Sequence, residues 1–316
     1  MPEKPIIIAT RGSALALTQA NLIFNACRKI FPRLAFEVKI IKTTGDKLQT
    51  ASLAKAGDSI PKGLFTKELE IALIKQKADL AVHSLKDLPT ELPAGLKLGA
   101  TPKREDVRDV LIYKVDAEFS GGVPQIREGG LIGTSSTRRE AQMRAVRPDL
   151  RFDEIRGNVP TRLEKLAEND ELDGTILAAA GLNRLNFTIS GDGFLEGDAV
   201  PDGIRAIALN TDIMLPCVGQ GAIGVEIRED DGRVEKIVDR LNHFNTITCV
   251  TAERSFLKSM GGGCQSPVGA YALVENGKLQ MRAVSFLSGS IQRTDQVGEL
   301  REPMALGELV ADQLRA

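Results

Sequence analysis

The sequence alternates short apolar runs with segments of helical periodicity, and this alternation constrains the fold more than any other feature. Runs that are typical of buried strands recur at 6–9, 36–41, 79–83, 131–133, 152–155 and 175–180. Between them, apolar residues at every third or fourth position indicate helices, at 15–30, 64–77 and 161–169. Strands that alternate with helices predict parallel or mixed sheets with helices on both faces, so we expect an α/β fold.

The pattern changes after about Asp230. Two helical segments followed by two alternating strands are expected there, at 234–241, 246–260, 268–274 and 278–286. The two strands are separated by Glu275-Asn276-Gly277, which is typical of a hairpin turn. The last part of the chain is therefore expected to form a small α+β domain. The segment 190–203 (SGDGFLEGDAVPDG), in contrast, is expected to be a loop.

Length and charge exclude several classes of protein. The chain has 316 residues, more than one hydrophobic core usually serves, so two or three domains are expected. Its formal net charge is −1, so no global field attracts nucleic acid or an anionic membrane. No run approaches roughly 20 apolar residues, which excludes a transmembrane helix. The N-terminal residues lack the pattern of a signal peptide, so a cytoplasmic location is expected.

The functional signal lies where strands are followed by helices. In open α/β sheets, ligands bind at the carboxyl ends of strands, where helix N-termini present free N–H groups. Each such junction in this sequence supplies hydroxyl or amide groups together with at least one cation. The junctions are Thr10–Ser13, His83–Asp87, Thr134–Arg139 and Arg156–Arg162.

The arginines at these junctions point to an anionic ligand. Arg138, Arg139 and Arg162 fall in the first turn of a predicted helix, where the helix dipole opposes a cation by about 0.3–1 kcal/mol. Arginine is also the side chain best suited to bidentate binding of carboxylate or phosphate. Any one of them alone would be interpreted as a solvated charge, but four cationic junctions favour a shared polyanionic ligand. Whether that ligand carries phosphates or carboxylates stays open, although no GxxxxGK[ST] or GxGxxG motif indicates a nucleotide.

Asp87 is the one acid among these cations. It is a candidate for general acid–base work or for pairing with a cation of the substrate, and the alternative is a helix-capping or salt-bridging aspartate. His83 is expected to be a hydrogen-bonded structural residue. Cys27 and Cys249 are expected in the core, and Cys217 stays ambiguous. The four cysteines show no CxxC spacing, which argues against a zinc site and against a disulfide framework.

Cys264 follows three consecutive glycines in Gly261-Gly262-Gly263-Cys264-Gln265-Ser266-Pro267. Glycines are costly to order and suit a backbone that passes close to something bulky. A thiol on such a turn can be reached by another molecule. A flexible surface turn with an incidental thiol is the alternative.

The chain resembles the porphobilinogen deaminase family, also called hydroxymethylbilane synthases. The resemblance rests on motifs that span nearly the whole chain in the family's order: ATRGSALALTQA, GLFTKELE, ADLAVHSLKDLP, GTSSTRR, RGNVPTRL, LAAAGLNRL, VGQGAIGVE, TAERSFL and GGGCQSPVGAYA. It implies two α/β domains that resemble the type II periplasmic-binding fold, and a small C-terminal α+β domain that carries the cysteine loop. The implied domains are 1–104 with 207–229, 105–206, and 230–316.

The resemblance also implies a chemistry, that of a transferase in tetrapyrrole (haem) biosynthesis. A dipyrromethane cofactor is joined to Cys264 by a thioether, and four porphobilinogen molecules are added to it in turn. Each addition expels ammonia and passes through an azafulvene-like cation, and water finally releases the linear tetrapyrrole. The family's catalytic aspartate corresponds to Asp87.

Further site residues are carried over from the family's motifs. Those implied to bind the cofactor, besides Cys264, are Lys86, Ser135, Arg138, Arg139, Arg162 and Arg184. Those implied to bind substrate are Arg11, Ser13, Lys55, Lys62 and Arg156. No metal is implied, and a monomer is expected with no nucleic acid or membrane partner.

Some positions depart from the family's pattern. The stretch 55–63 is longer than its usual glycine–lysine loop, which leaves the role of Lys62 open, and 190–203 is also lengthened. Pro160 replaces a small residue, and Cys217 stands where alanine is expected. The alternative function is a non-catalytic anion-binding protein of the periplasmic-binding type, since a fold alone does not fix function. Such a protein gives no reason for the glycine–cysteine turn.

Overall fold

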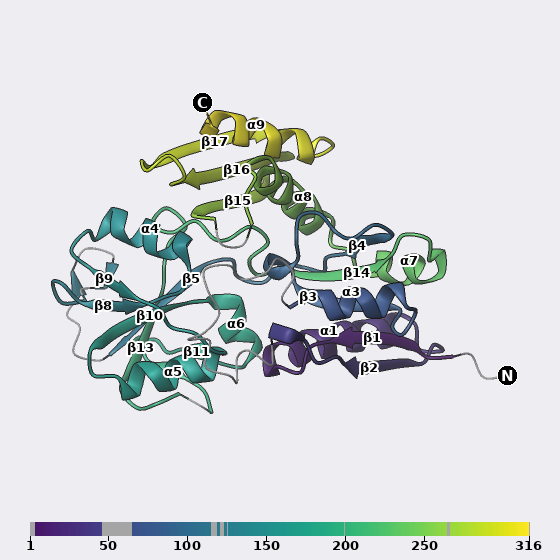
Figure 1. Cartoon of the computed structure of the whole chain (residues 1–316), viewed down its shortest axis with the longest axis horizontal. Helices are drawn as coiled ribbons and strands as arrows, with labels where there is room; N and C mark the ends of the chain where they lie inside the picture. The colour runs from purple at the N-terminus through teal and green to yellow at the C-terminus, as the bar shows by residue number, and fades with distance from the viewer. Residues whose placement is uncertain are drawn as a thin grey trace.

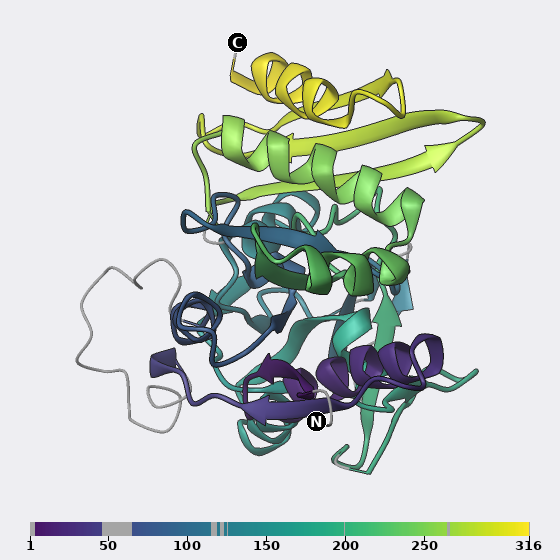
Figure 2. The ribbon, with the colours of Figure 1, turned by 90° about the vertical axis from the view of Figure 1, so that its right-hand side faces the viewer.

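The computed structural model describes residues 4–45, 65–114, 126–198, 200–263 and 266–315, and the backbone of 119–120 and 123–124. Three sheets with their helices form three units, which Figure 1 shows as separate bodies. We call their sheets the first, second and third sheet in chain order. The unit of the third sheet lies above the other two in both Figure 1 and Figure 2.

The first sheet has five strands in the order β2-β1-β3-β14-β4. Their bounds are β1 (Ile6–Thr10), β2 (Phe36–Ile40), β3 (Leu80–Ser84), β4 (Leu96–Ala100) and β14 (Ile223–Arg228). β1 runs parallel to both β2 and β3, whereas β14 is antiparallel to β3 and β4. The carboxyl ends of β1 and β3 therefore meet at one edge of the sheet.

Helices cover both faces of the first sheet because its strands alternate between two apolar cores. Ile6 and Ile8 pack with α1 (Ala14–Ile30), α7 (Gly232–Val238) and the 3₁₀ turn η2 (Asp239–Leu241). Ala9 points the other way and packs with α3 (Lys67–Ile74). We therefore propose that the first domain extends to Leu241 and that the third domain begins there rather than at 230.

The second sheet also has five strands, in the order β13-β5-β10-β8-β9. Their bounds are β5 (Asp109–Lys114), β8 (Leu131–Gly133), β9 (Arg151–Asp153), β10 (Leu172–Ala178) and β13 (Ile204–Ala208). β8 is parallel to β9 and β10, and β5 is antiparallel to β10 and β13. Its helices are α4 (Thr137–Val146), α5 (Val159–Glu168) and α6 (Ala179–Arg184).

The chain crosses between these two units twice. The first crossing (101–108) leads from β4 to β5, and the second crossing (209–222) leads from β13 back to β14. The crossings touch each other, because the Glu105 amide donates to the Gly221 carbonyl at 3.2 Å. The second unit is thus an insertion between two neighbouring strands of the first sheet.

The third sheet is antiparallel and has the order β15-β16-β17. Its strands are β15 (Val268–Glu275), β16 (Lys278–Ser285) and β17 (Gln292–Gly298), and its helices are α8 (Phe244–Ser259) and α9 (Pro303–Arg315). Both helices share one apolar core with the sheet. Gly307 lets α9 approach the backbone of α8, since a Cβ there would lie 2.2 Å from the Ala252 carbonyl oxygen.

The predicted fold class, two α/β units followed by a small α+β unit, is confirmed by these sheets. The prediction for 190–203 was wrong in part, because β12 (Leu195–Glu196) pairs with β11 (Thr188–Ile189) in a short hairpin. Leu195 anchors that hairpin in the second unit's core, which the polar composition of the segment did not indicate. A further two-residue pair joins β6 (Phe119–Ser120) to β7 (Val123–Pro124). Within the described ranges, no helix has the length and apolarity to span a membrane.

Candidate active site

A pocket lies at the edge of the first sheet where β1 and β3 end. We call it the Asp87 pocket. It is lined by Arg11, Ser13, Leu15, Ala16, Gln19, Phe65, Thr66, Val82, His83, Ser84 and Asp87. The sequence had placed Arg11, Ser13 and Asp87 at two separate junctions, and the parallel pairing of β1 with β3 brings these junctions together.

Local contacts order the polar side chains of this pocket. Ser13 caps α1 by accepting from the Ala16 amide at 3.3 Å. The Arg11 guanidinium lies over the Phe65 ring, 4.2 Å from its centroid, as in a cation–π contact. The Gln19 amide donates to the Ser84 hydroxyl at 2.9 Å. Gln19 and Phe65 were not predicted as site residues, although both lie within motifs of the resemblance, because a glutamine inside a helix and a phenylalanine do not by themselves indicate a polar site.

Asp87 is exposed at the end of the 3₁₀ turn η1 (Leu85–Asp87). Its neighbour Lys86 is partly buried, and burial lowers the pKa of Lys86. The charge of Arg139 lowers the pKa of Lys86 further, while Asp87 opposes this shift. Because Lys86 belongs to the first unit and Arg139 to the second, the two units bring their cations close together at this point.

Arg138 and Arg139 are both buried at the start of α4 and share one carboxylate. Arg138 Nη1 lies 2.7 Å from Asp109 Oδ2, and Arg139 Nη2 lies 2.7 Å from Asp109 Oδ1. Main-chain carbonyls complete the contacts, since Arg138 Nη1 donates to Leu215 and Arg139 Nη1 to Ile176, each at 2.7 Å. The sequence predicted the arginines but missed Asp109, which reads as an ordinary strand-flanking residue.

Arg162 lies in the same group of cations. Burial, followed by the charges of Arg139 and Arg156, lowers the pKa of Arg162 to about 10. Its Nε donates to the Gly157 carbonyl at 2.9 Å. Arg156 is more exposed and forms an ion pair with Glu154. We define Lys86, Arg138, Arg139, Arg156 and Arg162 as the cation cluster.

Ser135 and Arg184 contact main chain in this structure. The Ser135 hydroxyl donates to the Ile155 carbonyl at 2.8 Å. Arg184 Nη2 donates to the Gly221 carbonyl at 2.7 Å, which attaches α6 to the second crossing. Burial lowers the pKa of Arg184, although Glu105 opposes the shift.

His83 is structural, as predicted, because its Nε2 lies 2.9 Å from Glu226 Oε2 and both side chains are buried. Cys27 and Cys249 are buried, also as predicted, and burial raises their pKa values to about 11 and about 12. Cys217 is partly buried beside the cation cluster. Burial raises the pKa of Cys217, while the charges of Arg138 and Lys86 lower it.

Three predicted site residues, Lys55, Lys62 and Cys264, lie outside the described residues. The chain that leads to Cys264 is described as far as Gly263. Gly261 in that stretch has φ +67°, a conformation that favours glycine. Among the described residues, no group of three or more His, Cys, Asp or Glu side chains is arranged to hold a metal ion.

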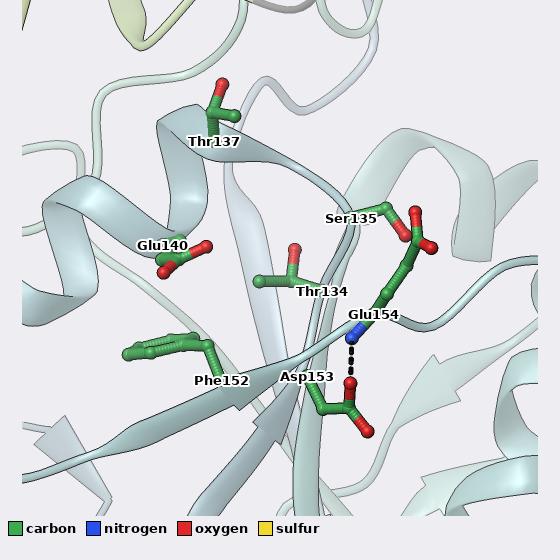
Figure 3. Close-up of a pocket in the computed structure, with 7 residues that line it drawn as sticks. All are labelled: Thr134, Ser135, Thr137, Glu140, Phe152, Asp153 and Glu154. Carbon is green, nitrogen blue, oxygen red and sulfur yellow. Dashed lines mark hydrogen bonds between the residues drawn. The ribbon is translucent and has the colours of Figure 1, made fainter. Parts of the chain in front are cut away.

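Figure 3 shows a second pocket, of about 260 Å³, at the carboxyl ends of β8 and β9. It is lined by Thr134, Ser135, Thr137, Glu140, Phe152, Asp153 and Glu154. Three of these side chains carry carboxyl groups, and the Glu154 amide donates to Asp153 Oδ1 at 2.7 Å. An acidic lining of this kind does not suit a ligand that carries carboxylates.

Several solved structures are similar to this chain at low identity. The VFT2 domain of BvgS from Bordetella pertussis is 12% identical, with a TM-score of 0.41 over 76% of this chain and 86% of that domain. The periplasmic sulfonate-binding protein SsuA from Methylobacillus flagellatus KT is 13% identical, with a TM-score of 0.42 over 82% of this chain and 69% of that protein.

Sequence comparisons are far closer. The family model described as "Porphobilinogen deaminase, dipyromethane cofactor binding domain" matches residues 6–236, and that of the "Porphobilinogen deaminase, C-terminal domain" matches 247–316. The porphobilinogen deaminase of Carboxydothermus hydrogenoformans is 45% identical over 99% of this chain and 94% of its own length. Those of Syntrophobacter fumaroxidans and Brevibacillus brevis are 40% and 42% identical, over 99% and 98% of this chain and 95% and 93% of their own lengths. The chain therefore belongs to the porphobilinogen deaminase family, the hydroxymethylbilane synthases, which are transferases with a dipyrromethane cofactor.

Proposed function

We propose that the Asp87 pocket and the cation cluster form one active site, in which four porphobilinogen molecules are joined head to tail with loss of ammonia. This assignment rests on one observation: cations from the two α/β units lie so close together that the charge of Arg139 lowers the pKa values of both Lys86 and Arg162. Asp109 and Glu154 each supply one negative charge to this five-residue cluster, and the remaining crowded cations repel one another unless a further anion binds among them. Each porphobilinogen unit carries an acetate and a propionate, so a lengthening chain supplies such anions.

The residues present fit the cofactor as well as the substrate. Guanidinium groups are the best protein partners of carboxylates, and we propose that Arg138, Arg139 and Arg162 bind the cofactor's side chains. Lys86, Ser135 and Arg184 are proposed to assist them. The dipyrromethane group, when bound, supplies the pyrrole carbon to which the first unit is joined. We propose Cys264 as its thioether attachment point, because this cysteine lies in the family's GGGCQSP motif.

Asp87 is proposed to act on the substrate's aminomethyl group. Its exposed carboxylate can accept a hydrogen bond from the ammonium nitrogen before ammonia leaves. The same carboxylate can then stabilise the positive charge that develops on the carbon skeleton. Arg11 and Ser13, which line the same pocket, are proposed to bind the carboxylates of the incoming unit, together with Arg156 and the lysines Lys55 and Lys62.

We further propose that the enzyme works as a monomer in the cytoplasm. One chain supplies every candidate site residue, so no second copy is needed to complete the site. The described cysteines Cys27, Cys217 and Cys249 are all free thiols, as is usual in a reducing compartment. Light scattering at the concentration used for assay would measure the mass of the assembly, and a stable dimer would contradict the proposal.

The test of the proposed site combines turnover with intact mass. Asp87→Asn should keep the covalent cofactor and the fold but lose most turnover, whereas Asp87→Glu should retain part of it. Cys264→Ala should have the mass of the unmodified chain and no activity. Near-native turnover of Asp87→Asn would assign the chemistry to another group. Peptide mapping that finds the cofactor on Cys217 would contradict the attachment site.

A further inference from the structure

Asp109, the first residue of β5, has a carboxylate that accepts four hydrogen bonds from side chains of both the second unit and the second crossing. It is completely buried, and it accepts from Arg138 and from Arg139 through the bonds given above. Arg139 Nε adds a contact to Oδ1 at 3.0 Å, and Gln220 Nε2 another at 3.1 Å. Burial alone would raise the pKa of Asp109, but the charges of Arg138 and Arg139 hold that pKa well below its usual range. The carboxylate is therefore charged and balances one of the two buried cations.

The two arginines are held differently by this carboxylate. All three guanidinium nitrogens of Arg139 donate hydrogen bonds: Nε and Nη2 donate to Asp109, and Nη1 donates to the Ile176 carbonyl. Arg138 uses Nη1 for both of its contacts, to Asp109 and to the Leu215 carbonyl. Within the described ranges, its Nε and Nη2 bond to no other group. The Nε–Nη2 edge of a guanidinium is one that binds a carboxylate in bidentate fashion.

Asp109 also lies where both crossings meet. It follows directly on the first crossing, and its main-chain carbonyl accepts from the Leu209 amide of the second crossing at 2.8 Å. Gln220, near the end of the second crossing, donates both to Asp109 and to the Val107 carbonyl. The orientation of the arginine pair is thus set by the segment that joins the two α/β units.

We propose that Asp109 is the positioning residue for cofactor binding: it orients Arg138 and Arg139 and balances one of their charges, so that the free edge of Arg138 is presented to a cofactor carboxylate. This inference rests on the proposed role of the two arginines. It assigns to Asp109 a function in cofactor loading that differs from stabilising the fold. A residue that only stabilised the fold would change the amount of folded protein but not how fast that protein takes up cofactor.

The experiment measures cofactor loading, not turnover. Apo-enzyme that is produced without porphobilinogen is mixed with porphobilinogen, and the covalently modified fraction is followed by intact mass. Asp109→Asn, which keeps the shape but removes the charge, should load at least tenfold more slowly per folded molecule, with the folded fraction measured by circular dichroism. Gln142→Leu is the matched control, because Gln142 is buried on α4 and shares the Leu215 carbonyl with Arg138, but it is uncharged and does not contact Asp109. It should lower stability and leave the loading rate within about twofold.

A double-mutant cycle keeps the proposal testable if Asp109→Asn folds poorly. Asp109→Asn combined with Arg139→Met removes both charges of one ion pair and should recover folding. If Asp109 acts through the arginines, the double variant should load no more slowly than Arg139→Met alone. Additive losses, or an Asp109→Asn enzyme that loads as fast as Gln142→Leu, would overturn the inference. If Arg138→Leu and Arg139→Leu both load normally, the proposed binding role of the arginines fails instead, which separates the two failures.

Discussion

Arg104 and Glu253 form a buried, two-pronged ion pair, with Nη1 2.6 Å from Oε1 and Nη2 3.0 Å from Oε2. Arg104 lies on the first crossing and Glu253 on α8, so the pair attaches the third unit to the connection between the other two. Glu253 also accepts from the amides of Gly219, on the second crossing, and Ala272, on β15. One carboxylate thus attaches the third unit to both crossings.

Glu253→Gln should destabilise the protein severely. Breaking a buried ion pair leaves Arg104 uncompensated, at a cost of about 3–5 kcal/mol in the free energy of unfolding. Urea unfolding would measure this loss. The exposed pair of Lys258 with Glu91 provides the control, because Lys258→Met should change the free energy of unfolding by no more than about 1 kcal/mol. Equal losses in the two variants would show that the buried pair of Arg104 with Glu253 stabilises the protein no more than an exposed pair does.

The glycines before Cys264 should differ in their tolerance of a side chain. A Cβ at Gly262 would lie 2.5 Å from Ser266 Oγ and 3.2 Å from Leu257 Cδ1, whereas no atom of the described residues lies within 4 Å of one at Gly263. Gly262→Ala must therefore displace Ser266, whose hydroxyl accepts from the Gly263 amide at 3.0 Å. We expect Gly262→Ala to slow cofactor attachment several-fold and Gly263→Ala to leave it unchanged, both measured by intact mass. The reverse order would contradict the geometry.

Ionisation of Glu70 should lower the free energy of unfolding as the pH rises. Burial raises the pKa of Glu70 above its ordinary value of 4.5; the neighbouring Thr66 opposes this shift, and the charge of Glu226 adds to it. The folded chain therefore retains a proton that the unfolded chain has lost, and stability falls as the pH rises through this window. Glu70→Gln should raise the melting temperature at pH 8 but not at pH 4. Glu164→Gln, at an exposed position, is the control and should leave the melting temperature unchanged at both pH values. If Glu70→Gln raised the melting temperature equally at pH 4 and pH 8, the proposed link to the pKa of Glu70 would be refuted.

Replacing a cofactor-binding arginine should have a different effect from replacing a substrate-binding arginine. Replacing both Arg138 and Arg139 with Leu should prevent cofactor loading. Arg11→Leu and Arg156→Leu should carry the cofactor but stall at partial chain lengths, which mass spectrometry resolves. Each lost charge-assisted bond costs about 1.5–3 kcal/mol, or roughly ten- to hundredfold in rate. Arg151→Leu, at an exposed position on β9, is the control and should neither prevent cofactor loading nor stall chain growth. Loss of the cofactor in Arg11→Leu would refute the division into cofactor-binding and substrate-binding arginines.

The sequence predicted those features that depend on local periodicity. The strand runs at 6–9 and 79–83 became the parallel pair β1 and β3, so the junctions with Arg11 and Asp87 were correctly identified as neighbours of a sheet edge. Features that depend on distant partners were missed. Asp109 contacts residues 29 and 111 positions away, and a lone aspartate before a strand carries no sign of that. For the same reason the packing of α7 on the first sheet was missed, since an amphipathic helix does not indicate which core it joins.

The two crossings have a consequence for how the chain folds as it is made. All strands of the second sheet come from the continuous stretch 109–208, so that sheet can be complete when residue 208 has been synthesised. The first sheet has to wait for β14, which lies between β3 and β4 and begins only at Ile223. Until then β3 and β4 each lack a neighbour, and unpaired strand edges invite misassociation. The unit that begins the chain is therefore completed after the unit that interrupts it.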